Sequence, residues 1–467
     1  MKKLEKRAFL CLLMAAVLLA GLVFFVARLE RNGAEWAGFY ANRHVYTNGV
    51  LSVGSVSDRN GRLLLKNDKN GAHYSDDSEL RRATYHVVGD RGGNIATAAN
   101  TAFRSRLIGY SPILGTTGIF RDSGRDLVLT VDAEINREAY RALAGRNGTI
   151  CVYNWKTGEI LAMVSGPSAD PAAQSAAGSA EGDGSGNSEV PSGTYLNKAL
   201  SATYPPGSVF KLVTTAAAIE QLEDMDSWTF TCSGSCTIDG EKVTCPYAHG
   251  KVDFYGALAR SCNGAYASLA VELGGDVLQE YAEKTGLTSV YDIDGIRTAA
   301  GSFNFQSSDL NVGWAGIGQF EDQVNPLAMM VYVGAIAGEG KAAKPVLLRG
   351  NALLEKGETL LSRDSGRGRA GSVSLLAAGT ARQIRDMMRN NVKANYGDGN
   401  YPGLSLHAKT GTAEVGKGKN PHSWFVGFSG DYVFAVCLEN SGYGASAAGP
   451  AANRVLQAMK KAGYLTE

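Results

Sequence analysis

The chain has 467 residues, of which 44% are hydrophobic and 19% charged, so most of it can fold around an apolar core. Lysine and arginine total 46 against 45 aspartate and glutamate, a formal net charge of +1 that argues against a nucleic-acid-binding protein with a broad basic surface. Seven cysteines are too few for a small disulfide-framed domain. The length fits about three domains of ~150 residues, or one large domain with additions.

The N-terminal segment predicts a membrane anchor. Residues 8–27 carry no charge and would span about 30 Å as a helix, the thickness of the hydrocarbon core of a bilayer. Residues 1–7 are mainly basic, so we expect them as a cytoplasmic tail with the rest of the chain outside the cytoplasm. A cleaved signal peptide is the alternative, but its apolar region is usually only ~7–15 residues long. We therefore expect a single-pass membrane protein held in the lipid bilayer by residues 8–27.

Two segments are expected as additions to a larger domain. Residues 28–126 predict a short, mixed, non-catalytic module, in which residues 54–65 are typical of two strands around an Asn60–Gly61 turn. Residues 166–193 are rich in alanine, serine and glycine, and such a composition cannot bury enough apolar surface to order itself. That second segment is predicted to be a mobile surface loop.

Residues 127–467 predict a single α+β domain. Its strand-like runs come early and late, at 127–131, 148–165 (a hairpin), 406–414, 423–428 and 432–438. Helical periodicity falls mostly between them, after an N-cap at Asp132 and at 209–216, 266–273, 374–395 and 451–462. Because strands flank the helices in sequence, we expect one sheet that both ends of the segment complete.

Ser208 is the only serine in the chain with a lysine three residues later, Lys211, and it stands at the start of a predicted helix. Positions i and i+3 share a helix face, so the hydroxyl and the amine would be neighbours. The helix N-terminus offers free N–H groups where an oxyanion would form, and a lysine with a lowered pKa can activate a serine. Taken alone, so short a pattern is more often an ordinary N-cap serine beside a solvated lysine.

A second pattern, Ser-x-Asn, occurs at 185–187, 261–263 and 302–304. The first lies in the low-complexity segment and is discounted, and the third is not excluded by its pattern. Ser261 and Asn263 stand on a short connection between two helical patterns. That position suits a rigid second serine with an amide that holds substrate.

A third pattern, Lys-Thr-Gly, occurs at 156–158, 284–286 and 409–411. The first forms a hairpin turn, and the second ends a helix with a glycine C-cap. Only the third places its lysine on a predicted strand with a glycine beside it. There, the missing side chain would let a substrate backbone approach the strand edge.

Together, Ser208-x-x-Lys211, Ser261-x-Asn263 and Lys409-Thr410-Gly411 resemble, in this order, the three motifs of penicillin-binding proteins and serine β-lactamases. The surrounding stretches YPPGSVFK, IGQFEDQVNPLAMM, AKTGTAE and HSWFVGF resemble the transpeptidase domain of class B penicillin-binding proteins, and SVSDRNGRLLL resembles their N-terminal module. The region before Leu127 has neither the length nor the motifs of a glycosyltransferase domain, which argues against class A. The resemblance implies an antiparallel sheet flanked by helices, plus an all-helical subdomain.

The resemblance also implies acyl transfer on peptidoglycan stem peptides that end in D-Ala-D-Ala. Ser208 would attack the penultimate carbonyl and release D-Ala, and an amine from a neighbouring stem would resolve the acyl-enzyme into a cross-link. Lys211 would be the general base, Ser261 a proton relay to the leaving amine, and Asn263 a ligand of the substrate amide. β-Lactams, which mimic the dipeptide, would be covalent inhibitors that acylate Ser208.

The strand motif is assigned to substrate binding by the same resemblance. Lys409 would supply positive field and bind the terminal carboxylate together with Thr410 and Thr412, next to Gly411. The oxyanion hole would be the N–H groups of Ser208 and Thr412. No cofactor, no metal in the catalytic site and no nucleic-acid partner is expected. Relatives of this class commonly pair with a membrane glycan polymerase, although no residue here identifies one.

Three other functions stay open. A D,D-carboxypeptidase would resolve the acyl-enzyme with water. A β-lactamase needs a deacylating base, and no convincing glutamate motif lies between Ser261 and Lys409; a β-lactam sensor belongs to the same alternative. An inactive cell-wall scaffold would recruit partners through its N-terminal module and membrane helix, but the intact set of motifs argues against it.

Four residues form a C-x3-C-x8-C-x3-H set: Cys232, Cys236, Cys245 and His249. Outside the membrane, a disulfide between two of the three cysteines is the expected state. Free thiols and a structural zinc site are the alternatives, the latter with a spacing unlike a standard zinc finger. The remaining cysteines of the domain, Cys151, Cys262 and Cys437, are expected as small buried residues.

Overall fold

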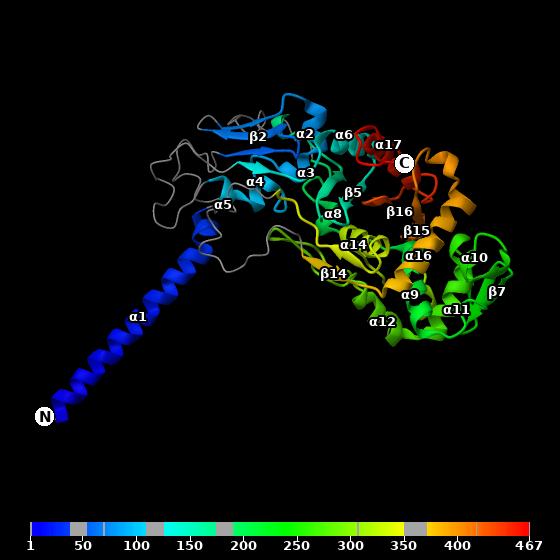
Figure 1. Ribbon diagram of the computed structural model, residues 1–467, viewed down its shortest axis with the longest axis horizontal. Helices are drawn as coiled ribbons and strands as arrows, with labels where there is room; N and C mark the ends of the chain where they lie inside the picture. The colour runs from blue at the N-terminus through cyan, green and yellow to red at the C-terminus, as the bar shows by residue number, and fades with distance from the viewer. Residues whose placement is uncertain are drawn as a thin grey trace.

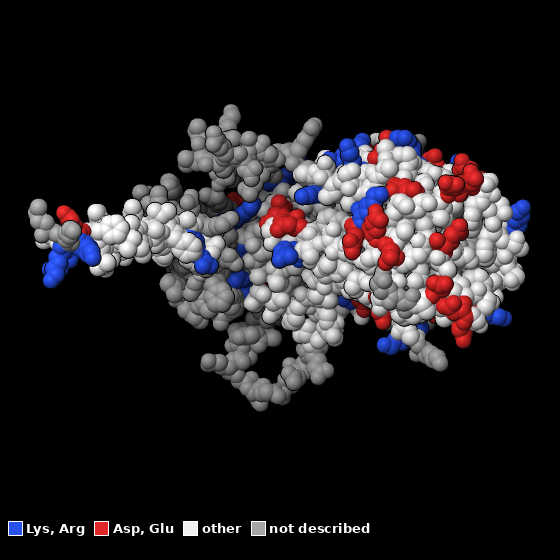
Figure 2. All heavy atoms as spheres, turned by 90° about the horizontal axis from the view of Figure 1, so that it is seen from below, with Lys and Arg blue, Asp and Glu red and all other residues white. Residues whose placement is uncertain are grey.

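The computed structural model describes residues 2–37, 54–68, 71–108, 126–173, 190–305, 308–349, 371–416 and 418–466. Helix α1 (Lys2–Ala37) extends away from the rest of the chain (Figure 1). Its stretch Lys3–Leu29 is long and apolar enough to cross a membrane, and its apolar side chains lie exposed. Figure 2 shows basic side chains at the N-terminal tip of this helix and an uncharged stretch after them. The predicted anchor falls inside α1.

Strands on both sides of residue 126 form a small sheet in the order β3-β2-β1-β4. Strands β1 (Ser55–Ser57) and β2 (Leu63–Asp68) pair antiparallel around the predicted turn, where Gly61 has a φ of +82°. Strand β3 (Gly71–Tyr74) pairs with β2, and β4 (Leu127–Val128) pairs parallel with β1. Four short helices follow β3: α2 (Ser78–Ala83), α3 (Tyr85–Val88), α4 (Ala99–Ala102) and α5 (Arg104–Leu107). The predicted hairpin is confirmed, while the boundary at residue 126 stays a prediction.

The main sheet has five antiparallel strands in the order β15-β16-β17-β5-β6. They are β5 (Gly148–Asn154), β6 (Ile160–Gly166), β15 (His407–Ala413), β16 (His422–Ser429) and β17 (Tyr432–Leu438). Early and late segments therefore complete one sheet, as predicted, but the strand expected at 127–131 pairs with β1 in the small N-terminal sheet instead. Strand β15 lies at one edge, which leaves the outer side of its backbone outside the sheet's ladder.

Both faces of this sheet are covered, because β6 and β17 are buried at every position instead of alternating. Helices α6 (Ala133–Leu143) and α17 (Ala448–Lys461) lie side by side over one face (Figure 1). Asp132 caps α6 by accepting hydrogen bonds from the amides of Glu134 and Ile135, as predicted. Helix α14 (Pro326–Ala337), buried at all but its last residue, packs on the other face.

The remaining elements form a helix-rich part that packs against α14 and against strands of the main sheet. Its helices are α8 (Lys198–Ser201), α9 (Lys211–Gln221), α10 (Phe254–Ala259), α11 (Asn263–Leu273), α12 (Gly275–Lys284), α13 (Asp309–Ala315) and α16 (Ala378–Asn391). Short turns of other pitch are η3 (Gly207–Val209), η4 (Val392–Tyr396) and η5 (Asp398–Asn400). The predicted α+β architecture is confirmed.

This part is not all-helical, because short strand pairs interrupt it. The pairs are β7 (Thr229–Cys232) with β10 (Gly250–Asp253), β8 (Ser235–Ile238) with β9 (Glu241–Thr244), β11 (Asp292–Ile293) with β12 (Ile296–Arg297), and β13 (Lys341–Ala343) with β14 (Ser372–Ser374). Most of the predicted alanine- and serine-rich loop lies outside the described residues.

Candidate active site

The turn that carries Ser208 packs directly against the edge strand β15. Ser208 is half-buried in η3, immediately before α9, and the amide of Gly207 donates to the carbonyl of Gly318 at 2.7 Å. Gly207 has a φ of +54°, and a Cβ there would lie 2.5 Å from the carbonyl oxygen of Thr412. Only glycine allows this close approach, so the local sequence Pro-Pro-Gly-Ser fixes the serine beside β15.

Gly411 makes the same contact possible from the strand side. A Cβ on Gly411 would lie 2.8 Å from the carbonyl oxygen of Pro206 and 3.0 Å from Val209. The indole N–H of Trp424, which pairs with Gly411 across the sheet, donates to the carbonyl of Pro205 at 2.9 Å. The space beside Gly411 is therefore filled by the serine turn, whereas the sequence led us to expect a substrate backbone there.

Lys211 is fully buried and reaches from α9 to the second motif. Its Nζ donates to the Ser261 carbonyl at 2.7 Å and to Oδ1 of Asn263 at 2.7 Å, and it lies 3.3 Å from the Ser261 hydroxyl. The ammonium also sits 5.6 Å from the ring centroid of Tyr266. Burial lowers the pKa of Lys211 to about 7, because desolvation disfavours the charged amine.

Ser261 lies on the connection between α10 and α11, as predicted, in a strained conformation. Its φ of +51° is in the left-handed region that side chains other than glycine rarely adopt. Strain of this kind is held only where surrounding contacts over-determine the backbone, and it is concentrated at functional sites. Here the N–H of Ser261 donates to the carbonyl of Leu258, and the N–H of Cys262 donates to the carbonyl of Ala257. Both bonds hold the turn against the end of α10.

Lys409 is the second buried amine at this site. Its Nζ donates to the Ser261 hydroxyl at 2.9 Å and to the Thr410 carbonyl at 3.0 Å. Burial, and secondarily the charge of Lys211, hold the pKa of Lys409 well below its usual range. The structure thus brings Lys211 and Lys409 together at the hydroxyl of Ser261, with Asn263 bonded to Lys211. This group lies next to the turn that carries Ser208.

The two threonines of the strand motif are half-buried and fixed by neighbours that the sequence did not single out. The N–H of Thr410 donates to the Tyr396 hydroxyl at 3.0 Å, and the two side-chain oxygens lie 3.0 Å apart. The side-chain amide of Gln319 donates to the Thr412 carbonyl at 3.3 Å, and the backbone N–H of Gly444 donates to the Thr412 hydroxyl at 3.3 Å. Tyr396 lies in a π-helical turn, a feature that is frequent at functional sites. The pattern of apolar residues in the sequence does not predict such a turn.

The other copies of the motifs lie elsewhere. Lys156 forms an exposed ion pair with Asp431, and Lys284 pairs with Glu220. Ser302 joins a β-bridge to Gln323. The copy at 185–187 lies outside the described residues.

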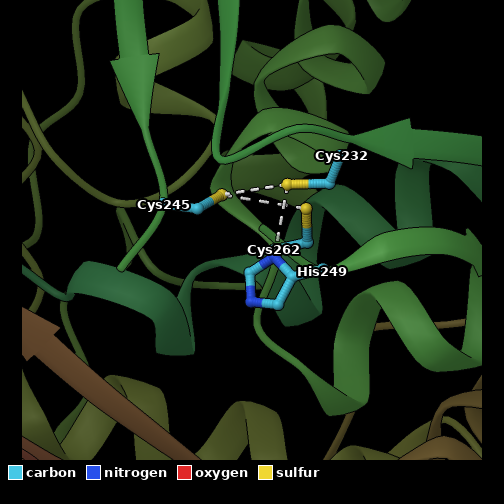
Figure 3. Close-up of side chains that lie close together, drawn as sticks. All are labelled: Cys232, Cys245, His249 and Cys262. Carbon is cyan, nitrogen blue, oxygen red and sulfur yellow. Dashed lines mark hydrogen bonds between the residues drawn. The ribbon is translucent and has the colours of Figure 1, made fainter. Parts of the chain in front are cut away.

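The cysteine set differs from the one that sequence spacing indicates. Figure 3 shows the side chains of Cys232, Cys245, His249 and Cys262 gathered in one cluster, and Cys236 is not one of its members. Among the described residues all seven cysteines are free thiols, so the expected disulfide is not formed. Cys151, Cys262 and Cys437 are buried, as predicted, but Cys262 also belongs to this cluster.

The sequence of this chain is similar to those of known proteins. The sequence profile of the family described as penicillin binding protein transpeptidase domain matches residues 148–457. The peptidoglycan D,D-transpeptidase PbpA of Mycolicibacterium smegmatis is 29% identical over 349 residues, which cover 70% of this chain and 70% of that protein. The chain therefore belongs to the penicillin-binding protein transpeptidase family, as a class B penicillin-binding protein.

Two solved structures show the same fold. The D,D-transpeptidase domain of a peptidoglycan glycosyltransferase from Eggerthella lenta matches with a TM-score of 0.71 and 25% identity, over 89% of this chain and 99% of that chain. Penicillin-binding protein A of Mycobacterium tuberculosis, solved as a ceftriaxone acyl-enzyme complex, matches with a TM-score of 0.71 and 23% identity, over 87% and 98% of the two chains.

Proposed function

We propose that this chain is a serine-type peptidoglycan D,D-transpeptidase that cross-links stem peptides ending in D-Ala-D-Ala. The observation that carries the proposal is the Ser261 hydroxyl, which lies within hydrogen-bond distance of both Lys211 and Lys409. The serine turn packs against the strand of Lys409, so the three motifs converge. Family membership and the name of the M. smegmatis relative support the reaction class.

In the acylation step, Ser208 Oγ attacks the carbonyl carbon of the penultimate D-Ala. Its proton passes to Lys211 Nζ, which a pKa of about 7 makes partly neutral and able to accept it at neutral pH. The C–N bond then breaks, and the leaving D-Ala amine takes a proton through the Ser261 hydroxyl. The products are a Ser208 ester and free D-Ala. Ser261 suits this relay because it contacts both amines.

Substrate binding falls to the second and third motifs. The side-chain amide of Asn263 has two N–H donors. One donates to the Thr244 carbonyl at 2.8 Å, and the other would donate to a carbonyl of the substrate. The terminal carboxylate of the substrate, which Thr410 and Thr412 would also bind, would favour the charged form of Lys409 and so oppose the lowering of its pKa by burial. Gly411 contributes by admitting the serine turn. The N–H groups of Ser208 and Thr412 would form the oxyanion hole.

In the second step the amine of a neighbouring stem attacks the ester carbonyl, the C–O bond to Ser208 breaks as the amide forms, and Ser208 Oγ takes up the proton that the attacking amine loses. β-Lactams would acylate Ser208 in the same way. The membrane helix would place residues 28–467 outside the cytoplasm, with 28–126 as a non-catalytic module and 127–467 as the catalytic domain. A membrane glycan polymerase is the partner we propose for the strands that this enzyme cross-links.

Labelling of the full chain with a fluorescent penicillin tests the proposal. We expect a persistent adduct that Ser208→Ala abolishes. Rapid loss of the adduct would instead identify a β-lactamase, and no adduct in either form would identify a scaffold. Analysis of cross-linked muropeptides from depleted cells separates the remaining pair, because loss of a transpeptidase lowers cross-linking, whereas loss of a carboxypeptidase lets pentapeptide stems accumulate.

A further inference from the structure

We propose that Cys232, Cys245, His249 and Cys262 bind one structural Zn²⁺ ion that holds the Ser261–Asn263 segment in place. The four ligand atoms lie within 4.8 Å of one another, and Cys232, His249 and Cys262 are buried. The catalytic part of this statement rests on the proposed function, whereas the metal site does not. It replaces our expectation from the sequence of a disulfide in this region.

The distances fit a tetrahedral metal site. With Zn–S bonds of about 2.3 Å, two sulfurs of a regular tetrahedron lie about 3.8 Å apart, and a sulfur and a histidine nitrogen lie about 3.5 Å apart. The Sγ atoms of Cys232 and Cys245 are 3.8 Å apart, those of Cys245 and Cys262 are 3.8 Å apart, and Cys232 Sγ lies 3.4 Å from His249 Nδ1 (Figure 3). A disulfide needs about 2.05 Å between sulfurs.

The ligands come from four element ends. Cys232 ends β7, Cys245 follows β9, His249 precedes β10, and Cys262 is the N-cap residue of α11. Cys236 lies inside β8, paired with Val243, and is not part of the cluster. Three thiolates and one imidazole with no carboxylate form a closed set that prefers Zn²⁺ over Mg²⁺ or Ca²⁺.

The region around the cluster has little core of its own. Strands β7 to β10 form two separate two-stranded sheets, and their side chains are exposed or half-buried except at Cys232, Val243 and Val252. Isolated two-stranded sheets are marginally stable in water. A structural metal commonly supplies the missing stability in such small segments.

Groups around the ligands orient them. The Gly264 amide donates to Cys245 Sγ at 3.4 Å, which favours a thiolate there. Arg260 donates to the His249 carbonyl at 2.5 Å, and the Tyr247 ring packs edge-on against the imidazole with centroids 4.5 Å apart. Outer contacts of this kind fix the direction of metal ligands.

The metal would act on the active site through Cys262, which is the residue between Ser261 and Asn263. Both neighbours contact Lys211, and Asn263 also donates to the Thr244 carbonyl next to Cys245. A metal joining Cys262 to Cys245 would therefore connect the strained second motif to the strand pairs β7–β10 and β8–β9. The cluster is a positioning device, since none of its atoms is proposed to touch the substrate.

Metal analysis of the full chain, purified in detergent without added metal, tests the site. We expect about one zinc per chain, retained in Cys236→Ser and lost in Cys245→Ser and Cys262→Ser. Cys236→Ser is the matched control, because it removes a thiol from the neighbouring strand β8 that is not one of the four proposed ligands. Iron in place of zinc, a disulfide among the four residues found by mass spectrometry, or equal zinc loss in the control and the ligand variants would each overturn the proposal.

A second experiment avoids variants that fail to fold. A zinc chelator applied to the wild-type chain should slow acylation by fluorescent penicillin roughly 10- to 100-fold, and added Zn²⁺ should restore it, because small displacements in an active site cost rates of that order. Ser208→Ala should keep its zinc while losing all labelling. Zinc without labelling in the wild type would refute the proposed function but not the metal site. An unchanged acylation rate after full zinc removal would refute the positioning role.

Discussion

The amine of Lys409 donates a 2.9 Å hydrogen bond to the hydroxyl of Ser261, although the two residues stand 148 positions apart in the sequence. The same hydroxyl lies 3.3 Å from Lys211. Because both amines are buried, this serine oxygen is an acceptor shared by two desolvated groups that would repel each other when charged. Ser261 therefore links Lys211 of the first motif to Lys409 of the third motif.

Replacing Ser261 should reduce the acylation rate far more than it reduces the stability of the fold. For Ser261→Ala we expect penicillin acylation to slow by about 10²- to 10⁴-fold, the usual contribution of a proton-transfer group. The fold should lose only about 1–3 kcal/mol, because one acceptor for buried donors disappears. Stopped-flow acylation and denaturant unfolding measure the two effects.

Ser302→Ala is the matched control, since Ser302 belongs to the other described Ser-x-Asn copy. It should leave the acylation rate unchanged. Equal rates in wild type and Ser261→Ala would show that this hydroxyl takes no part in acylation.

The lowered pKa of Lys211 predicts a pH-dependent reaction. If neutral Lys211 is the base, the acylation rate should rise with pH and level off above about 7, the pKa in the folded chain. Lys211→Arg should remove this rise together with most of the activity, because arginine stays protonated. A wild-type acylation rate that is flat from pH 5 to 9, measured with the fluorescent penicillin, would contradict the assignment.

The same shift has a consequence for stability. Between about 7 and ~10.4, the ordinary value for lysine, the unfolded chain binds a proton at Lys211 that the folded chain does not. The free energy of unfolding should therefore increase with pH across this window, and Lys409 contributes with the same sign because its pKa is also lowered. Lys211→Met should flatten the increase, which urea unfolding at several pH values would measure.

The elements that carry the site were predictable because their signals are local. Alternating and continuous apolar runs gave the strands of the main sheet, and Asp132 marked the start of α6. Ser208 needed no choice, because no other serine has a lysine three residues later. The third motif could be chosen because only Lys409 stands on a predicted strand, whereas the position of Ser261 between two helices favoured it without excluding Ser302. Of the other copies, Lys156 and Lys284 form ion pairs with acidic side chains, and Ser302, which the sequence left open, joins a β-bridge.

What could not be predicted depends on contacts between distant segments. Nothing near Gly411 in sequence indicates that Pro206 would fill the space beside it. Spacing grouped Cys236 with Cys232, but Cys236 lies within a strand, whereas the clustered ligands lie at element ends. Cys262 joins them only because α11 packs against β7, β8 and β9, and no local sequence pattern predicts that packing.

Gly207 offers a test of the contact between the serine turn and β15. In Gly207→Ala the new Cβ would lie 2.5 Å from the Thr412 carbonyl oxygen, at a φ of +54°. We expect a loss of about 1–3 kcal/mol in stability for the strained backbone and a roughly 100-fold slower acylation, because Ser208 must move. Gly379→Ala is the control, since a Cβ there meets nothing within 4 Å. Similar acylation rates in both variants would refute the steric argument.

The ion pair between Lys198 and Glu439 lies largely out of water, with side-chain exposures of 6% and 19%. Glu439 also accepts a hydrogen bond from the Tyr204 hydroxyl at 2.7 Å, so removing the lysine leaves a partly buried carboxylate with a single neutral donor. We expect Lys198→Met to lower the free energy of unfolding by about 3 kcal/mol, near the lower limit for a broken buried pair.

Arg382→Met is the contrasting change, because the Arg382–Glu339 pair is 49% and 52% exposed and should contribute less than about 1 kcal/mol. The double variant Lys198→Met with Glu439→Gln should recover part of the loss, since no unpaired charge is then buried. Urea unfolding of the three variants and the wild type measures these differences. A loss in Lys198→Met no larger than in Arg382→Met would mean that water reaches Glu439 and that the pair behaves as a surface contact.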